Sequence, residues 1–170
     1  MKQISYRNDV LPLKNTLYRL ALRITLNREE AEDIVQETLI KVWNRRDSWE
    51  EIDSIEAFSL TTCKNLALDH LKKASRISDS LEKAVEERQD AGLSPLEQAQ
   101  QQDKLAHIKR LVDSLPEKQR SCMQLRDFEG KSYKEIARIL ELSEEQVKVN
   151  IFRARQAIKQ KFTKLDKYGL

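Results

Sequence analysis

The chain has 170 residues, of which 35% are charged and only 6% are aromatic, and its formal net charge is +3. Three glycines and three prolines are far fewer than the usual combined share of about 12%. This composition favours helices over a many-stranded sheet, and it argues against a P-loop or a dinucleotide fold, because both need clustered glycines beside a phosphate.

Charge divides the chain into three parts. Residues 1–76 carry 13 basic and 12 acidic side chains, residues 77–103 carry 2 and 7, and residues 104–170 carry 16 and 9. The acidic middle stretch is also rich in glutamine, which is typical of a linker. We therefore expect an all-α fold of two small helical domains, 1–76 and 104–170, joined by an acidic linker. The low net charge is then an average that conceals a C-terminal part at +7.

Amphipathic helices are predicted for the first domain. Asn27, with Glu30 three residues later, is a helix-capping pair, and Asp53 with Glu56 is expected to start a further helix after a polar turn at 44–53. Apolar residues recur at three- and four-residue steps within the first two helices, and each series forms one buried stripe. These residues are Leu17, Leu20, Ala21 and Ile24, then Ala31, Ile34, Val35, Thr38, Leu39 and Val42.

Helix caps also punctuate the second part of the chain. A capping box is predicted at 94–97, and a helix is expected from Pro116 to about Phe128, where Gly130 ends it. Two more capping boxes follow at 132–135 and 143–146. A short helix and a long helix joined by about three residues match a helix-turn-helix.

The long second helix has two contrasting faces. Val147, Ile151, Ala154, Ile158 and Phe162 form the predicted buried stripe. The outer face mixes cations and amides with two apolar groups, a combination suited to base edges, phosphates and thymine methyls in a major groove. We predict that it binds DNA through Glu145, Gln146, Lys148, Val149, Phe152, Arg153, Arg155, Gln156 and Lys159. The alternative is an ordinary amphipathic terminal helix with a solvated basic face.

Two further sets of residues in the first domain indicate binding. Cations beside a loop aromatic suit single-stranded nucleic acid, in which bases stack on rings. That set is Arg46, Trp49, Lys64, Asn65, Lys72 and Lys73, unless the tryptophan is tucked against its own domain. A polar helix face that is either simply solvated or docks a partner consists of Asp33, Gln36, Glu37 and Lys41.

These residues carry a family resemblance. Ala31–Trp43 (AEDIVQETLIKVW) resembles region 2 of bacterial RNA polymerase sigma factors, and three later segments resemble region 4. Those segments are Leu115–Arg120 (LPEKQR), Gly130–Ala137 (GKSYKEIA) and Val147–Arg155 (VKVNIFRAR). The order of the motifs and the length of the chain are similar to the extracytoplasmic-function (ECF) class.

The resemblance implies a role for each set. The face of Asp33, Gln36 and Glu37, with Lys41 beside it, would dock core RNA polymerase. The 44–53 loop and Asn65 would capture a flipped base of the single-stranded downstream (−10) element. Lys148, Val149, Phe152 and Arg153 would read the duplex upstream (−35) element. The resemblance also implies an anti-sigma partner, and we expect no catalytic residue, metal or cofactor.

Departures from the family and two other function classes complete the prediction. Phe58 stands where many relatives have tryptophan, and Val149 and Asn150 are less basic than in many relatives. A conventional helix-turn-helix regulator would bind duplex DNA tightly without polymerase. An enzyme is disfavoured because His70 and His107 fit no metal-ligand or catalytic pattern. The absence of a signal-peptide core and of an apolar run of ~18–20 residues predicts a cytoplasmic protein without membrane insertion. Cys63 and Cys122 are expected to be buried free thiols.

Overall fold

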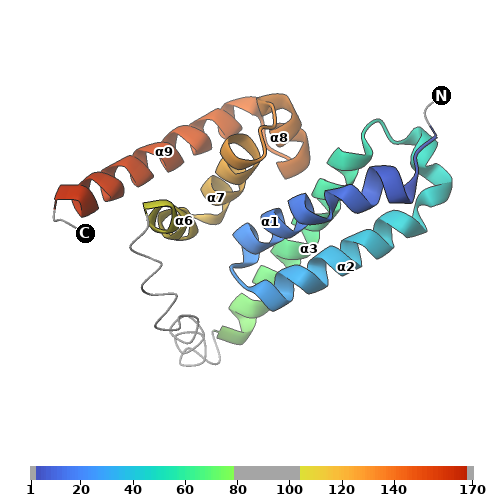
Figure 1. Cartoon of the computed structure of the whole chain (residues 1–170), viewed down its shortest axis with the longest axis horizontal. Coiled ribbons are helices and arrows are strands. Elements are labelled where there is room, and N and C mark those ends of the chain that lie inside the picture. The colour runs from blue at the N-terminus through green and yellow to red at the C-terminus, as the bar shows by residue number, and fades with distance from the viewer. Residues whose placement is uncertain (1–2, 79–103, 168–170) are drawn as a thin grey trace.

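The structure, a computed structural model, describes residues 3–78 and 104–167, and every regular element in these ranges is a helix (Figure 1). The expected all-α fold is confirmed. Most of the predicted linker, including the capping box at 94–97, lies outside the described residues. The elements are η1 (Tyr6–Val10), η2 (Leu11–Leu13), α1 (Lys14–Thr25), α2 (Arg28–Asn44), η3 (Arg46–Glu51), α3 (Ile55–Ser78), α6 (Lys104–Asp113), α7 (Glu117–Met123), η4 (Gln124–Phe128), α8 (Tyr133–Leu140) and α9 (Glu144–Lys167).

The first lobe, residues 3–78, is a bundle in which α1, α2 and α3 all pack against one another (Figure 1). Its interior is made by the predicted apolar stripes, because Leu17, Ile24 and Ile34 are fully buried. Asn27 caps α2 as predicted, since its Oδ1 accepts a hydrogen bond from the backbone N–H of Glu30 at 3.1 Å. The sequence pattern therefore decides which face of each helix turns inward.

The start of α3 differs from the prediction by one residue. Ser54, not Asp53, caps the helix, because Ser54 Oγ accepts a hydrogen bond from the backbone N–H of Ala57 at 3.1 Å. The Asp53 carboxylate instead lies 3.8 Å from the Arg138 guanidinium of α8. Both residue types are good helix caps, so local preference alone does not choose between them.

The second lobe, residues 104–167, contains the predicted helix-turn-helix in α8 and α9. Ser132 Oγ accepts from the backbone N–H of Glu135, and the Glu135 carboxylate accepts from the backbone N–H of Ser132, both at 3.1 Å. Ser143 and Gln146 make the same reciprocal pair at 3.1 and 2.9 Å. Between the helices Glu141 adopts a left-handed conformation with φ of 57°, which reverses the chain.

The helix predicted from Pro116 to about Phe128 is present but does not keep one pitch. It begins as α7 and widens into the π-helical turn η4 over its last five residues. Gly130, with φ of 71°, then occupies the left-handed position that ends the helix, as predicted.

The two lobes share a hydrophobic core. α3 packs against α8 and α1 packs against α7 (Figure 1). Buried residues from both lobes, among them Leu60 and Cys63 of α3 and Cys122 and Ile136 of the second lobe, form one contiguous cluster. Both cysteines are free and buried, as expected, and burial raises the pKa of each thiol to about 12. Thiols with so high a pKa remain protonated and unreactive near neutral pH.

Candidate nucleic-acid interface

The two faces of α9 follow the helical period closely. Val147, Ile151 and Ala154 are buried as predicted, and Ile158 and Phe162 are half-buried farther along the helix. The opposite face is open to solvent over the residues 145–159. Every residue predicted to contact the upstream DNA element is exposed there: Glu145, Gln146, Lys148, Val149, Phe152, Arg153, Arg155, Gln156 and Lys159.

Contacts within the lobe hold several polar groups of this face in place. Arg155 makes a two-point contact with the Asp127 carboxylate, Nε at 3.1 Å and Nη2 at 2.5 Å, and this hydrogen bonding raises the pKa of the guanidinium. Lys148 Nζ lies 5.5 Å from the centre of the Tyr133 ring. In the described part of the chain, Arg153 has no side-chain partner. The face thus combines fixed and free cations.

The exposed face of α2 carries the residues predicted to dock polymerase. Asp33, Gln36, Glu37 and Lys41 are all exposed, and Gln36 and Glu37 lie three and four residues after Asp33, with Lys41 four residues after Glu37. Ile40, on the same helix, is 59% exposed, which the sequence reasoning did not single out. Ile40 thus adds one exposed apolar side chain to this otherwise polar face.

The loop after α2 requires a correction. Trp49 is only 6% exposed and its indole N–H donates to the Val42 carbonyl at 2.9 Å, so it is tucked against its own lobe and offers no stacking surface. The exposed ring is Trp43, at 44%, with the Arg46 guanidinium 4.7 Å from its centre and the Tyr6 ring edge-on at 5.2 Å. A cation beside an exposed aromatic is therefore present, but the aromatic is Trp43.

The remaining residues predicted for single-stranded DNA lie on α3. Asn65, Lys72 and Lys73 are exposed, as is Arg46 in the preceding loop. Lys64 is only 3% exposed, and its Nζ lies 3.7 Å from the Glu141 carboxylate in the turn of the helix-turn-helix. Lys64, which was predicted to bind single-stranded DNA, is therefore covered by the second lobe in this arrangement.

Comparison with known proteins identifies the family to which each lobe is similar. The model of Sigma-70 region 2 matches residues 10–77, and that of Sigma-70, region 4 matches residues 105–158. The chain is 32% identical over 140 residues to the ECF RNA polymerase sigma-E factor of Salmonella typhimurium, covering 78% of this chain and 73% of that protein. The chain belongs to the ECF class of RNA polymerase sigma factors. It acts in transcription initiation, with core RNA polymerase and promoter DNA as its partners.

Two further comparisons support this membership and the fold. The sigma factor is 28% identical over 157 residues to the RNA polymerase sigma-H factor of Pseudomonas aeruginosa, covering 88% of this chain and 81% of that protein. Its fold is similar to that of the sigma factor RpoE from Bartonella quintana, solved in complex with the anti-sigma factor NepR. That likeness has a TM-score of 0.72 at 23% identity and covers 95% of this chain and 98% of that chain.

Ionic contacts join the two lobes of this sigma factor around the shared core. Arg19 makes a two-point contact with Glu129, both distances 2.7 Å, and Arg23 Nη1 lies 2.6 Å from the Asp113 carboxylate. Three further ion pairs join the lobes, and they are Lys64–Glu141, Lys131–Glu56 and Arg138–Asp53.

Arg120 of the second lobe is buried in this interface, with only 8% of its surface exposed. Its guanidinium donates to the carbonyls of Arg23 and Ile24 at 2.9 and 3.0 Å, and to the carbonyl of Leu115 at 2.6 Å. The first two carbonyls lie in the last turn of α1, where helix carbonyls have no partner within the helix. Arg120 therefore caps a helix of the first lobe from the second, although burial lowers the pKa of its guanidinium.

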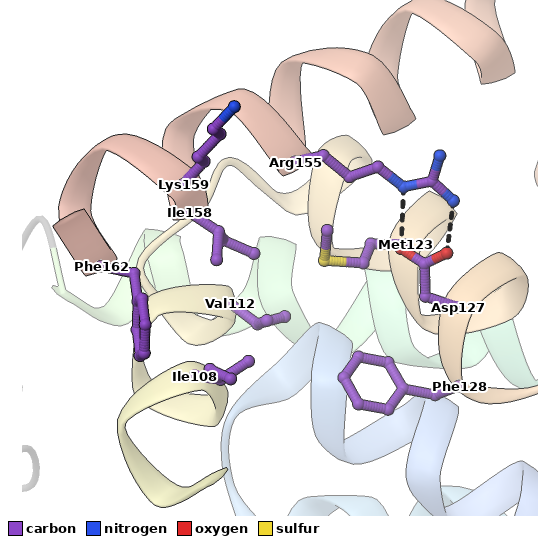
Figure 2. Close-up of a pocket in the computed structure, with 9 residues that line it drawn as sticks. All are labelled: Ile108, Val112, Met123, Asp127, Phe128, Arg155, Ile158, Lys159 and Phe162. Atoms are coloured by element: carbon purple, nitrogen blue, oxygen red, sulfur yellow. Dashed lines mark hydrogen bonds and ion pairs between the residues drawn. The ribbon is translucent and has the colours of Figure 1, made fainter. Parts of the chain in front are cut away.

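An apolar groove lies between α6 and α9 on the second lobe (Figure 2). Figure 2 shows Ile108, Val112 and Ile158 facing into it, with Phe162 at one end. The Asp127–Arg155 pair stands at its rim. The groove explains why the last two residues of the predicted stripe on α9 are only half-buried.

Within residues 3–78 and 104–167, none of the helices combines the length and the apolar character that a membrane span needs. No group of three or more histidine, cysteine or acidic side chains there is arranged to hold a metal ion.

Proposed function

We propose that the surfaces described above divide promoter recognition between the lobes. The outer face of α9 reads the duplex upstream element, and the α3 residues Asn65, Lys72 and Lys73 hold the single-stranded downstream element. The α2 face docks core polymerase. The observation that carries the proposal is that all nine residues predicted on α9 are exposed while its opposite face packs into the lobe. The sigma factor acts in the cytoplasm, by binding polymerase and DNA and without catalysing a reaction.

The packing of the two lobes against each other, which we call the closed form, restricts this function. Lys64, next to Asn65, contacts Glu141, which is three residues before the start of α9. The proposed downstream and upstream DNA surfaces are therefore close together in space. Elements named for positions −35 and −10 are about 25 base pairs apart, or about 85 Å at ~3.4 Å per base pair. The lobes must therefore separate before both elements are bound. We infer that an anti-sigma partner holds the lobes together and so shifts the equilibrium between the closed form and an open form toward the closed form.

Reconstituted transcription tests the division of labour. The chain with core polymerase should give a promoter-dependent transcript and a permanganate-reactive bubble. Replacing Arg153 with alanine should lower the transcript about tenfold, because loss of one base-edge contact costs about 1–3 kcal/mol. The matched control is Lys109→Ala, which removes an exposed cation from α6 and should leave the transcript unchanged.

Two results would count against this proposal. One is a tight complex with promoter duplex in the absence of polymerase, which is the behaviour of a conventional regulator. The other is equal loss of transcript in the Arg153 and Lys109 variants, which would show that only overall charge matters.

A further inference from the structure

A histidine stands at the edge of the seam between α2 and α3. His70 lies three and four residues after Ala67 and Leu66, which are both buried, so its ring borders the packed side of α3. On α2, Glu37 lies three residues after the buried Ile34, at the edge of the same seam. His70 Nε2 is 4.0 Å from a Glu37 carboxylate oxygen, and the two side chains are 28% and 48% exposed. The ring is therefore largely enclosed, whereas the carboxylate reaches solvent.

Glu37 also belongs to the face of α2 that we propose docks core polymerase, and the present inference rests on that proposed function. Between residues 28 and 37 the exposed charges of α2 are mainly acidic. They are Glu29, Glu32, Asp33 and Glu37, against one basic residue, Arg28. Charges across a protein interface are arranged so that a negative patch meets a positive one. The surface of polymerase that fits this part of α2 is therefore cationic.

The charge of the imidazole changes what Glu37 can offer to such a surface. Histidine gains or loses its positive charge between pH 5 and 8. A neutral ring leaves the Glu37 carboxylate its full attraction for a polymerase cation. A protonated ring pairs with the carboxylate and also repels a cation that approaches it. Protonation of His70 therefore opposes docking at Glu37.

We propose that His70 is a positioning residue for core docking, which draws Glu37 toward α3 when it is protonated and releases Glu37 to polymerase when it is neutral. Docking of the sigma factor is then weaker at acidic pH. His70 acts through Glu37 and needs no contact of its own with polymerase.

The other charged groups near this pair do not titrate in the same interval. Asp33 and Lys41 lie one turn before and after Glu37 on α2, and Lys73 lies one turn after His70 on α3. The helices α1, α8 and η1 also pack against α3. Within residues 3–78 and 104–167, however, the acidic oxygens within 4 Å of a His70 ring nitrogen belong to Glu37 alone. Aspartate and lysine ordinarily keep their charge between pH 6 and 8, so His70 is the group that changes.

Equilibrium binding of the full chain to core polymerase, at pH 8.0 and pH 6.0, tests the proposal. At pH 6.0 the wild type should bind core about two- to fivefold more weakly than His70→Gln does, the effect of one partly exposed ion pair. His70→Lys carries a permanent cation and should show the weaker binding at both pH values. The matched control is His107→Gln on α6, which removes the other histidine of the chain and should keep the wild-type pH dependence. Titration of polymerase itself affects all these proteins alike.

The carboxylate gives a second route to the same answer. Glu37→Gln should bind core more weakly at pH 8.0 and should lose the pH dependence that the wild type shows beyond His70→Gln. Adding His70→Gln to Glu37→Gln should then change nothing further, because the group through which His70 acts is gone. Glu37 is half-exposed, so this variant tests the proposal even if a thermal melt shows that His70→Gln does not fold.

The failures of the two proposals are distinguishable. If the wild type and His70→Gln lose the same affinity between pH 8.0 and 6.0, His70 does not act on docking and the inference is overturned, while the docking face stands. Stronger binding of the wild type than of His70→Gln at pH 6.0 would overturn it as well. If Glu37→Gln and Asp33→Ala both bind core like the wild type at pH 8.0, the α2 face does not dock polymerase and that part of the proposed function fails.

Discussion

Single residues show where local sequence reasoning is reliable in this sigma factor. The helical period alone places Val147 inside and Arg153 outside, because each position is decided by its own helix. Trp49 and Lys64 could not be placed in this way. The indole N–H of Trp49 is satisfied by a carbonyl seven residues earlier, and Lys64 is covered by a turn 77 residues later in the chain. Contacts that close at such separations leave no periodic trace in the sequence.

Arg120 provides the prediction at this scale. Replacing it with methionine keeps the side-chain bulk but leaves three carbonyls without their donor, so we expect a loss of about 2 kcal/mol or more in the free energy of unfolding. Lysine at this position should recover only part of the loss, because one ammonium cannot reproduce a planar fork of donors. Urea unfolding followed by circular dichroism measures both variants. Lys118→Met, an exposed change on the same helix, should stay near the wild type, and an equal loss in both variants would contradict the role of Arg120.

At the scale of elements, capping residues and the spacing of apolar residues were sufficient to predict most of the helices and their buried faces. The reciprocal pairs at Ser132 and Ser143 are both present, and so is the turn between α8 and α9. Asp53 was predicted to start α3, but Ser54 caps it, because both side chains are competent caps and local sequence does not distinguish them. The widening of α7 into η4 also had no local signal.

The turn at Gly130 gives a prediction for an element boundary. Its φ of 71° is costly for a residue with a Cβ, whereas a Cβ built there meets no atom within 4 Å. Gly130→Ala should therefore destabilise the protein by backbone strain alone, by about 1–2 kcal/mol. Asparagine adopts the left-handed conformation more readily, so Gly130→Asn should lose clearly less. Thermal unfolding of both variants decides the matter, and equal melting temperatures for alanine and glycine would exclude strain at this turn.

For the whole molecule, the sequence predicted two lobes and their separate surfaces but not that the lobes pack together. The shared core contains apolar side chains of both lobes, such as Leu60 of α3 and Ile136 of α8. Each lobe alone would expose these side chains to solvent. Charge also matters at this scale, since five ion pairs within residues 3–78 and 104–167 cross between a near-neutral lobe and a basic one. Lys64 had been predicted as a DNA contact, and Asp53 and Glu56 as residues that start a helix, but none of the partners had been predicted to join the lobes. Pairing between distant segments is information that neither composition nor helical period contains.

Closure of the lobes should therefore depend on specific charge pairs. Glu56→Lys places two cations together at the Lys131 position and should shift the free protein toward the open form, whereas Glu56→Lys combined with Lys131→Glu should restore closure. The readout is energy transfer between dyes on cysteines introduced at the exposed positions Glu32 and Lys164. Cys63 and Cys122 lie in the core that the lobes share and would be uncovered in the open form, so both are first replaced by serine to leave only the introduced cysteines for labelling.

Salt provides the independent control for this experiment. Raising sodium chloride from 0.1 to 1 M shortens the screening length from about 10 to about 3 Å, so the wild type should also open in part. Screening acts on the repulsion between two cations as well, and the single variant should therefore respond to salt less than the wild type does. If energy transfer is the same in all three proteins and at both salt concentrations, the shared core alone holds the lobes and the ion pairs contribute nothing measurable. A double variant that stays open would instead show that the cost lies in placing lysine at the start of α3, where an acidic residue favours the helix dipole.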